Sequence, residues 1–519
     1  MDYTFKGLRR SIYAQGSLRN ALAEELGLDE IEQVAVERES LDARRKPDIY
    51  RLYNLRFSVE RVTPRLERLL ADGQVRPHKE RPLRAPEPTL RLDPEPLIVG
   101  FGPAGMFLGL DLARKGYRPI IFERGQAVPE RAATVARLWR QGELDPECNL
   151  QFGAGGAGTW SDGKLSTGKS SPLDRHILRT FVRAGGPESI LVQAKPHIGT
   201  DYLQRVVTAM AAEIESLGGQ VHFGQRLEQI HLRDGAVDGL TVSGQRLATQ
   251  QVVLAIGHSA RDTVTMLHDI GVTMEPKPFA VGSRIEHPAA FINQAQYGSK
   301  AAQVLPPADY RLSYRAQGQA VYSFCMCPGG QVVCASSEPG GQVCNGMSRY
   351  ARSAPYSNSA LVVALAPQRL GWRSPLEAIA WQRELEARAF ASGGGDQVAA
   401  GQRAVDLMAG GPSADLPETS YQPGVRPGDL TEVLPPFVVR ALRGGLARFD
   451  RILPGFIEHG VLIGLESRTS SPVRILRDDT CQSVSTPGLF LLGEGAGYAG
   501  GIMTCARDAV RFAQRVIAR

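Results

Sequence analysis

The stretch Leu97-Ile98-Val99-Gly100-Phe101-Gly102-Pro103-Ala104-Gly105 decides the fold of this chain. Its apolar residues predict a short buried strand, and the glycines after it have the spacing Gly-x-Gly-x-x-Gly. Residues Met106 to Lys115 have the apolar spacing of a helix, and Arg118 to Glu123 predict the next strand. A strand, turn, helix and strand in this order are typical of the first unit of a dinucleotide-binding sheet.

Each glycine of this turn has its own task. Gly100 permits the tight turn, Gly102 lets the backbone approach a pyrophosphate, and Gly105 lets the helix pack close to the strand. The N-terminus of the helix favours an anion, and Glu123 ends the next strand, where a carboxylate can accept ribose hydroxyls. The residues expected to contact the dinucleotide here are Gly100, Gly102, Pro103, Ala104, Gly105, Glu123 and Arg124.

The end of the chain indicates which dinucleotide is bound. Residues 488–494 predict a strand that ends in an acid, and residues 500–518 predict a closing helix. FAD enzymes of the glutathione-reductase type end a strand in this way, and a helix N-terminus there can stabilise a reduced, anionic flavin. A glycine loop that only caps a helix is the alternative. We expect FAD, contacted by Gly493, Glu494, Gly500, Gly501 and Ile502.

A glycine-rich loop runs from Asn149 to Leu165, and its aromatic residues Phe152 and Trp160 favour burial over a flexible linker. Such a loop can bring backbone N–H groups close to a flat ligand, and Asp162 or Lys164 could reach the phosphates or the flavin N5 region. Residues expected to contact FAD from this loop and from a later strand end are Gly156, Gly158, Ser161, Asp162, Gly163, Lys164 and Gly257.

The chain of 519 residues exceeds the roughly 250–300 at which one core stops growing, so several packed units are expected. The predicted fold class is α/β: a Rossmann-like, GR2-type FAD-binding domain with an inserted mixed α+β substrate domain and a small N-terminal α/β module. The predicted parts are the module (1–71), a proline-rich linker (72–96), the FAD-binding domain (97–275 and 466–519) and the inserted domain (276–465).

Other helices and strands are predicted from the hydrophobic periodicity and from the turn-forming residues between the periodic segments. We expect helices over 17–26, from 201 to about 218 and over 375–391. Strands are expected over 31–39, 49–60, 221–223, 227–232, 237–242 and 252–256, with a hairpin turn at 233–235.

The composition excludes several classes of protein. Hydrophobic residues make up 43% and charged residues 22%, which argues against a disordered or fibrous chain. The net charge of +6 is spread along the sequence, which argues against nucleic acid as a partner. Without an apolar leader or a long apolar run, we expect a cytoplasmic protein that does not enter a membrane. Seven cysteines without zinc-site spacing predict reduced thiols and no metal.

Many segments resemble one family, the bacterial FAD-dependent dehydrogenases or NAD(P)/FAD-dependent oxidoreductases, which are largely uncharacterised. The resemblance covers nearly all of the chain and implies a two-lobed flavoprotein, but no substrate. In two places the chain departs from the family pattern: Ala154 stands where Glu is expected, and Met503 to Ala509 replace a run of smaller residues. The resemblance rests on residues 149–165, 195–201, 255–262, 281–288, 322–330 and 493–502.

Candidate catalytic residues lie mainly in and just after the inserted domain. Arg284 and Glu286 alternate along a strand and share a face, while Glu466 and Arg468 lie near the FAD tail. An arginine could hold a substrate carboxylate, and a glutamate could take the proton that leaves when hydride passes to flavin N5. Lys164 is a further candidate. Structural ion pairs between the lobes are the alternative.

Cys325 and Cys327 form a C-x-C pair in a glycine-rich segment. They could exchange electrons with the flavin, or they could be buried cysteines that line the pocket. His258 follows the strand at 252–256, and local hydrogen bonding is favoured over catalysis there.

These observations favour an FAD-dependent dehydrogenase or desaturase that oxidises a small organic substrate by hydride transfer to flavin N5. No second Gly-x-Gly-x-x-Gly occurs between Asp201 and Tyr350, which argues against a resident NAD(P)H domain. One alternative is a flavin monooxygenase with NAD(P)H as a transient electron donor. Another is an RNA-directed or non-catalytic FAD protein whose N-terminal module recognises tRNA. The oligomeric state does not follow from the sequence.

Overall fold

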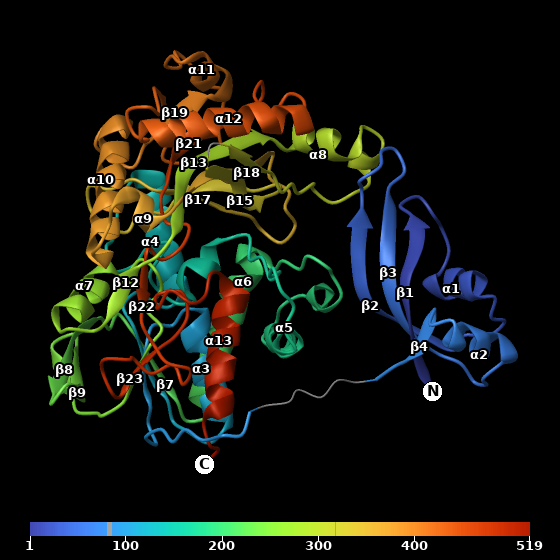
Figure 1. The fold of residues 1–519 in the computed structure, drawn as a ribbon, viewed down its shortest axis with the longest axis horizontal. Helices are drawn as coiled ribbons and strands as arrows, with labels where there is room; N and C mark the ends of the chain where they lie inside the picture. Colours follow the sequence, from blue (N-terminus) through green and yellow to red (C-terminus); the bar gives the residue numbers. More distant parts are fainter. Residues whose placement is uncertain (80–85, 317) are drawn as a thin grey trace.

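A parallel sheet forms the core of one of the two main lobes in the computed structural model, which describes residues 1–79, 86–316 and 318–519 (Figure 1). Leu97 pairs with Ile120 on one side and with Val252 on the other. Strand β5 is buried throughout, as an inner parallel strand requires. The sheet has the order β23 (Leu489–Leu491), β11 (Val252–Leu254), β5 (Leu97–Val99), β6 (Ile120–Glu123) and β7 (Gln220–Phe223).

Most helices of this domain cover one face of the sheet, and a small antiparallel sheet packs on the other face together with helix α7. Helix α13 packs against α3 and α5, and α3 packs against α6. The helices of this domain are α3 (Pro103–Arg114), α4 (Val128–Gln141), α5 (Leu173–Arg183), α6 (Gly199–Ser216), α7 (Arg261–Asp269) and α13 (Ile502–Arg515), with 3-10 turns Gly156–Trp160 and Glu188–Leu191. The small sheet contains β8 (Leu227–Arg233), β9 (Ala236–Val242) and β10 (Gln245–Leu247).

A second lobe is built on a seven-stranded sheet, and helix α12 packs against the strands at one end of it (Figure 1). The order is β14 (Ser313–Ala316), β15 (Gln319–Cys327), β18 (Tyr356–Leu365), β13 (Phe279–Pro288), β21 (Val461–Glu466), β19 (Ala399–Arg403) and β20 (Val425–Pro427). The helices are α8 (Ala289–Tyr297), α9 (Pro367–Leu370), α10 (Pro375–Gly393), α11 (Ala404–Ala409) and α12 (Pro436–Ile452), with a 3-10 turn Ala301–Gln303. A hairpin of β16 (Gln331–Cys334) and β17 (Cys344–Met347) lies on one face.

The chain passes between the two lobes at two neighbouring strands. Strand β12 (Met274–Pro276) leads out of the first lobe, and β22 (Val473–Ile475) leads back. The two strands pair antiparallel, with Met274 opposite Ile475 and Pro276 opposite Val473. The two crossings therefore lie side by side.

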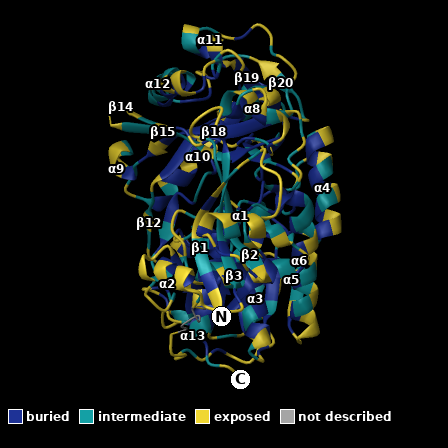
Figure 2. Cartoon of the chain, turned by 90° about the vertical axis from the view of Figure 1, so that its right-hand side faces the viewer, coloured by how far each residue is buried: buried dark blue, intermediate teal, exposed yellow. Residues whose placement is uncertain are grey.

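The N-terminal module is a four-stranded antiparallel sheet with two helices, in the order β2 (Gln33–Asp42), β3 (Tyr50–Ser58), β1 (Asp2–Ser11) and β4 (Val75–Pro77). Strands and helices α1 (Leu18–Leu26) and α2 (Pro64–Ala71) follow each other as β-α-β-β-α-β, the split βαβ arrangement. Both helices lie on the outer side of the module, where many of their residues are exposed (Figure 2).

Most strongly periodic segments have the type expected from the sequence, but several elements differ. The helices at 18–26, 199–216 and 375–393 and the hairpin at 227–242 match the prediction closely. Strand β1 was not predicted because a bulge between Lys6 and Leu8 breaks its alternation. Strand β4 lies within the predicted linker and contributes a single buried residue, Val75. Part of that linker, residues 80–85, lies outside the described residues.

Candidate functional site

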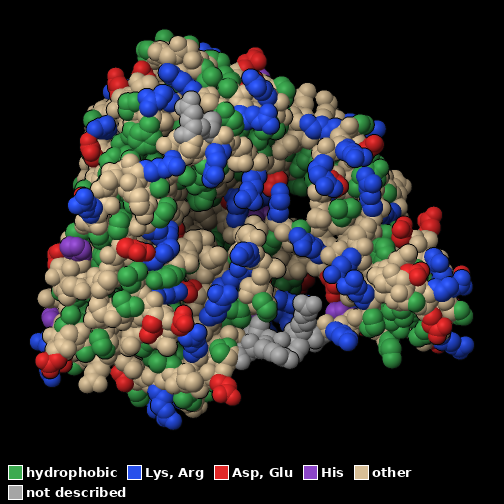
Figure 3. All heavy atoms as spheres, in the orientation of Figure 1, with side chains coloured by type: hydrophobic (Ala, Val, Ile, Leu, Met, Phe, Trp, Pro, Cys, Tyr) green, Lys and Arg blue, Asp and Glu red, His purple; other side chains and the backbone are tan. Residues whose placement is uncertain are grey.

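A cavity lies where the carboxyl ends of the central strands meet the second lobe. Figure 3 shows this face hollowed between the lobes, with Lys and Arg side chains gathered around the hollow. Among the residues expected to contact FAD, those on the cavity wall are Gly100, Gly102, Pro103, Ala104, Glu123, Arg124, Gly156, Gly158, Ser161, Asp162, Gly163, Lys164, Gly257, Glu494, Gly501 and Ile502. Among the catalytic candidates, Lys164, Glu466 and Arg468 line it.

The remaining predicted residues lie behind this wall. Gly105 lies in α3, where a Cβ would meet the Gly100 carbonyl oxygen at 1.9 Å, so its hydrogen allows the helix to approach the turn. Neither Gly493 nor Gly500 lines the cavity. Arg284 and Glu286 are buried in β13 and do not line the cavity either.

The glycine turn has the close backbone packing that its sequence predicts. Gly100 has φ +101°, and a Cβ there would lie 2.4 Å from the Ala255 carbonyl oxygen. Gly102 precedes α3 and no side chain caps the helix, so the first N–H groups of α3 remain available to an anion. The nearest atom to a Cβ on Gly102 would be Gly156 Cα at 3.9 Å, which shows that the two glycine segments face each other.

Glu123 organises the backbone around the cavity. Its Oε2 accepts the N–H of Phe101 at 2.8 Å, and its Oε1 accepts those of Gly125 and Gly153 at 3.0 and 2.8 Å. A carboxylate offers about four acceptor positions, so about one remains for a ribose hydroxyl. Glu123 thus joins the glycine turn to the glycine loop.

Arg131, on α4, holds the glycine loop, and we did not identify it from the sequence. Its guanidinium is fully buried and donates to four carbonyl oxygens, at distances of 2.6 to 3.0 Å. It also stacks on the Trp160 ring, 4.3 Å from the centroid. Desolvation lowers the pKa of Arg131 to about 10, so it remains charged at neutral pH. The four accepting residues are Asn149, Leu150, Ala154 and Gly156.

The end of the glycine loop is tied to the second lobe through Asp162. Its carboxylate accepts hydrogen bonds from Arg352 Nε and Nη2 at 2.9 and 2.7 Å and from Ser348 Oγ at 2.5 Å. Despite its burial, Lys164 and Arg352 hold the pKa of Asp162 well below its usual range. Ser161 turns the loop, because its Oγ donates to the Gly158 carbonyl oxygen and accepts the Gly163 N–H.

The C-terminal tail brings a second helix N-terminus to the cavity. Gly501 precedes α13 without a side-chain cap, and its N–H lies 3.4 Å from Glu494 Oε2. Burial raises the pKa of Glu494 to about 7. His258 Nδ1 lies 3.8 Å from Glu494 Oε1, and desolvation lowers the pKa of His258 to about 3, so the ring is neutral.

Arg284 and Glu466 form a buried ion pair beside the cavity. Arg284 Nη1 donates to Glu466 Oε2 at 2.6 Å, and both side chains are at most 1% exposed. Arg284 also donates to Asn358 Oδ1 and to the Cys325 carbonyl oxygen. Desolvation raises the pKa of Glu466, although Arg284 opposes the shift. Glu466 faces the cavity, while Arg284 supports it from behind.

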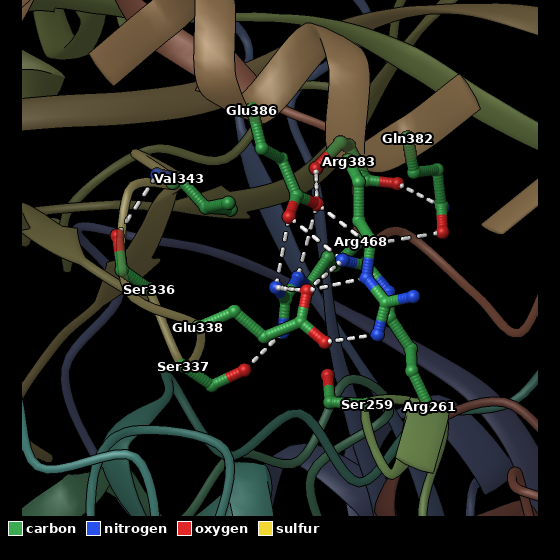
Figure 4. A network of polar contacts seen from close by, with 12 residues as sticks. Ser259, Arg261, Ser336, Ser337, Glu338, Val343, Gln382, Arg383, Glu386 and Arg468 are labelled. Carbon is green, nitrogen blue, oxygen red and sulfur yellow. Dashed lines mark hydrogen bonds and ion pairs between the residues drawn. The ribbon is translucent and has the colours of Figure 1, made fainter. Parts of the chain in front are cut away.

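Arg468 lines the cavity, but its charge is neutralised by a network that joins the two lobes (Figure 4). Glu386 of α10 accepts hydrogen bonds from both Arg468 and Arg261, at 2.7 to 3.1 Å. Arg261 lies at the start of α7 in the first lobe, and Glu338 receives a further bond from it at 2.7 Å. For Arg468, the alternative of an ion pair between lobes therefore agrees with its contacts.

Glu286 lies away from the cavity, in a polar contact within the second lobe. Its Oε1 accepts the N–H of Ser420 at 2.9 Å, and Ser420 Oγ donates to Oε2. Burial raises the pKa of Glu286 to about 7.

The cavity wall fits a bound dinucleotide. A Cβ on Gly257 or Gly501 would meet no atom within 4 Å, so both glycines border open space. Lys164 Nζ and His258 Nε2 are buried atoms, and neither has a hydrogen-bond partner among the residues that the structure describes. A polar ligand would satisfy such atoms, because a buried polar group without a partner costs about 1–3 kcal/mol.

In the described ranges 1–79, 86–316 and 318–519, none of the helices combines the length and the apolar character that spanning a membrane requires. No group of three or more His, Cys, Asp or Glu side chains there could hold a metal ion. All seven cysteines are free thiols.

The fold and the cavity together define a Rossmann-type dinucleotide-binding protein. Family models match in two places: "Flavin containing amine oxidoreductase" over residues 140–283 and "FAD-dependent protein, C-terminal domain-like" over residues 278–469. An uncharacterized protein of Clostridium beijerinckii is 42% identical over 499 residues, which cover 94% of this chain and 93% of that protein. The chain belongs to the same family as that protein, a family of FAD-dependent oxidoreductases, and FAD is its cofactor.

Solved structures of low identity also match. L-proline dehydrogenase from P. horikoshii is 10% identical, with a TM-score of 0.35, over 82% of this chain and 93% of that one. L-amino acid deaminase from Proteus myxofaciens is 12% identical, with a TM-score of 0.33, over 85% and 93%. CtdE in complex with FAD is 12% identical, with a TM-score of 0.31, over 80% and 81%. At these scores the matches do not bear on substrate or mechanism.

Proposed function

We propose that this FAD-dependent oxidoreductase is a dehydrogenase of a small organic substrate, and that Glu466 accepts the proton which the substrate releases. Bound FAD would supply the hydride-accepting chemistry at its N5 atom. The observation that carries the proposal is the position of Glu466. Its carboxylate is 1% exposed and lies on the same cavity wall as the glycine turn and the C-terminal helix.

Glu466 has the environment of a general base. Arg284 holds one carboxylate oxygen, Oε2, while no described residue donates a hydrogen bond to Oε1. Desolvation raises the pKa of this carboxyl from its usual value toward neutrality, where a base transfers protons most effectively. Arg284 keeps the carboxylate in place and neutralises it when it is ionised.

Lys164 would orient the substrate. Its Nζ is buried and lies 3.1 Å from Asp162 Oδ2 without a hydrogen bond in suitable geometry. Burial opposes its charge, but the nearby sulfur atoms of Cys325 and Cys327 and the Asp162 carboxylate raise the pKa of Lys164 overall. The ammonium can therefore donate to an oxygen of the substrate. Phe324, which is 37% exposed on the same wall, offers an apolar surface beside it.

Anaerobic bleaching of the flavin absorbance by a panel of small amines, amino acids and hydroxy acids tests the proposal. We expect at least one compound to reduce the flavin, and Glu466→Gln to slow that reduction by about 10²–10⁴-fold, the usual contribution of a general base. Glu286→Gln removes a carboxyl from the same sheet but outside the cavity, and should change the rate little.

Equal rates for Glu466→Gln and the native protein would exclude Glu466 as the base. Rapid flavin reduction by NADPH, without reduction by any compound of the panel, would overturn the dehydrogenase assignment. It would instead support the flavin monooxygenase, in which NAD(P)H is the electron donor.

A further inference from the structure

Cys325 occupies a strained position on the cavity wall. It lies at a bulge of β15, where Phe324 pairs with Ala360 but Cys327 pairs with Asn358, so one residue too many stands on the β15 side. Its φ is +44°, in the left-handed region that side chains other than glycine rarely adopt. Such strain is maintained when the surrounding structure requires it, and it is concentrated at functional sites. The bulge directs Cys325 toward the cavity.

The second cysteine lies directly behind the first. Cys327 is completely buried, and its thiol points back along the strand to the Cys325 carbonyl oxygen, 3.3 Å away. Cys325 is partly exposed. A thiol open to the cavity with a buried thiol next to it is the usual arrangement of an attacking cysteine and its resolving partner.

Two cations face this pair. Arg284 Nη2 donates to the Cys325 carbonyl oxygen at 2.6 Å and lies 3.6 Å from Cys327 Sγ. Lys164, whose Nζ is buried and has no hydrogen-bond partner among the described residues, lines the same cavity as Cys325. A positive environment of this kind favours a thiolate, which is the reactive form of cysteine.

The direction of the pKa shift separates Cys325 from the other six thiols. The neighbouring Cys327 thiol, together with Lys164 and Arg284, holds the pKa of Cys325 well below its usual value, while the neighbouring Cys325 sulfur and burial raise the pKa of Cys327. Desolvation raises the pKa of each of the other five thiols: Cys148, Cys334, Cys344, Cys481 and Cys505. Cys505 lines the cavity too, so a place on its wall does not by itself produce a thiolate.

We propose that Cys325 and Cys327 are a redox-active dithiol that exchanges two electrons with the bound FAD. In the oxidising direction Cys325 reacts as its thiolate: the S–H bond of Cys327 breaks, one S–S bond forms, and two electrons and one proton leave the sulfur atoms. The oxidised flavin takes up the two electrons and the proton and becomes reduced by two electrons. In the reverse direction, the disulfide takes the two electrons and one proton from reduced flavin, which restores the Cys325 thiolate and the Cys327 thiol. Cys325 is the sulfur that faces the cavity, and Cys327 completes the bond.

Counting reducing equivalents tests this proposal without a substrate. Oxidised holoprotein titrated anaerobically with dithionite should take up four electrons per FAD, two for the flavin and two for the disulfide. Cys325→Ser and Cys327→Ser should each take up two. Cys505→Ser, which removes a cavity-lining thiol outside the pair, should still take up four. Two electrons in the native protein would overturn the proposal.

Alkylation provides a second readout that does not depend on the flavin. With iodoacetamide followed by peptide mass analysis, Cys325 and Cys327 should be protected in the oxidised protein and modified after reduction. In the reduced protein Cys325 should react first, and Lys164→Met, which removes a nearby positive charge, should move the pH midpoint of its alkylation rate upward by about one unit. Equal modification of both cysteines before and after reduction would exclude the disulfide, whatever the outcome of the substrate assays.

Discussion

At the scale of single residues, Arg131 supports one wall of the cavity from a neighbouring helix. It serves four carbonyl oxygens of residues 149–156 from a fully buried position. The side chains of that loop are mostly small or apolar, and Thr159 Oγ1 adds a second donor at the Ala154 carbonyl oxygen. The loop therefore takes its shape from a residue on a different element.

Arg131→Met should loosen the glycine loop. The methionine fills part of the volume but leaves carbonyl oxygens without donors, so we expect a loss of at least about 3 kcal/mol in the free energy of unfolding. FAD content should fall as well. Urea unfolding and the ratio of flavin to protein absorbance measure both effects. Arg137→Met, on the same helix but half exposed, is the control and should change stability by about 0.5 kcal/mol or less. Similar losses in both variants would contradict this role for Arg131.

The residues that line the cavity can be predicted from the sequence better than the residues that hold them in place. The spacing of Gly100, Gly102 and Glu123 in the sequence predicts their roles, because a tight turn and a ribose acceptor need those residue types. Arg131 gives no such signal: it lies among charged and apolar residues of an ordinary amphipathic segment, and its burial depends on the loop that folds over it. Arg468 was expected to be catalytic because it lies close to the FAD tail in the sequence. Its ion-pair partner Glu386 is 82 residues away, so local spacing could not predict that pairing.

At the scale of elements, helices α7 and α10 are joined by one carboxylate. Glu386 of α10 lies between Arg261 of α7 and Arg468 and is 1% exposed. The two arginines hold the pKa of Glu386 well below its usual range. Two buried guanidinium groups thus share Glu386 as their buried counter-charge, and Glu338 also pairs with Arg261.

Glu386→Gln should be strongly destabilising. It keeps the shape of the side chain but leaves buried positive charge poorly compensated, which costs about 3–5 kcal/mol in comparable buried pairs. The measurement is the free energy of unfolding by urea. Glu384→Gln, which breaks an exposed pair with Arg388 on the same helix, should cost less than about 1 kcal/mol. Equal free energies of unfolding for the Glu386→Gln and Glu384→Gln variants would contradict this role of Glu386.

The elements were predicted to different degrees, for physical reasons. The long helices and the 227–242 hairpin follow from local periodicity and turn residues. The seven-stranded sheet did not, since its neighbours are distant in sequence: β13 pairs with β18 and with β21, nearly 180 residues further along. Pairings of that kind depend on tertiary packing, which periodicity does not encode.

At the scale of the whole molecule, buried carboxyl groups should make stability depend on pH. Burial raises the pKa of Glu286 to about 7 from its usual value near 4.5. The folded protein then holds a proton that the unfolded chain has lost. Its stabilising contribution is complete below about pH 4.5 and is lost as the pH rises through about 7.

Glu286→Gln isolates this contribution. The variant and the native protein should have similar stability at pH 5, while at pH 8 the variant should be more stable, by up to an order of 3 kcal/mol. Urea unfolding across this range measures the difference. Glu458→Gln changes an exposed carboxyl of the same lobe and should show no such trend. A difference that shrinks as the pH rises would have the wrong sign for a protonated Glu286.

The paired crossing of β12 and β22 has a mechanical consequence. Two covalent connections that run side by side and are hydrogen-bonded to each other act as one hinge, because neither can swing independently of the other. We expect any opening of the two lobes to be a rotation about this ladder. The buried ion pairs of Glu386 with Arg261 and Arg468 would have to break in such a rotation, so these ion pairs hold the two lobes closed.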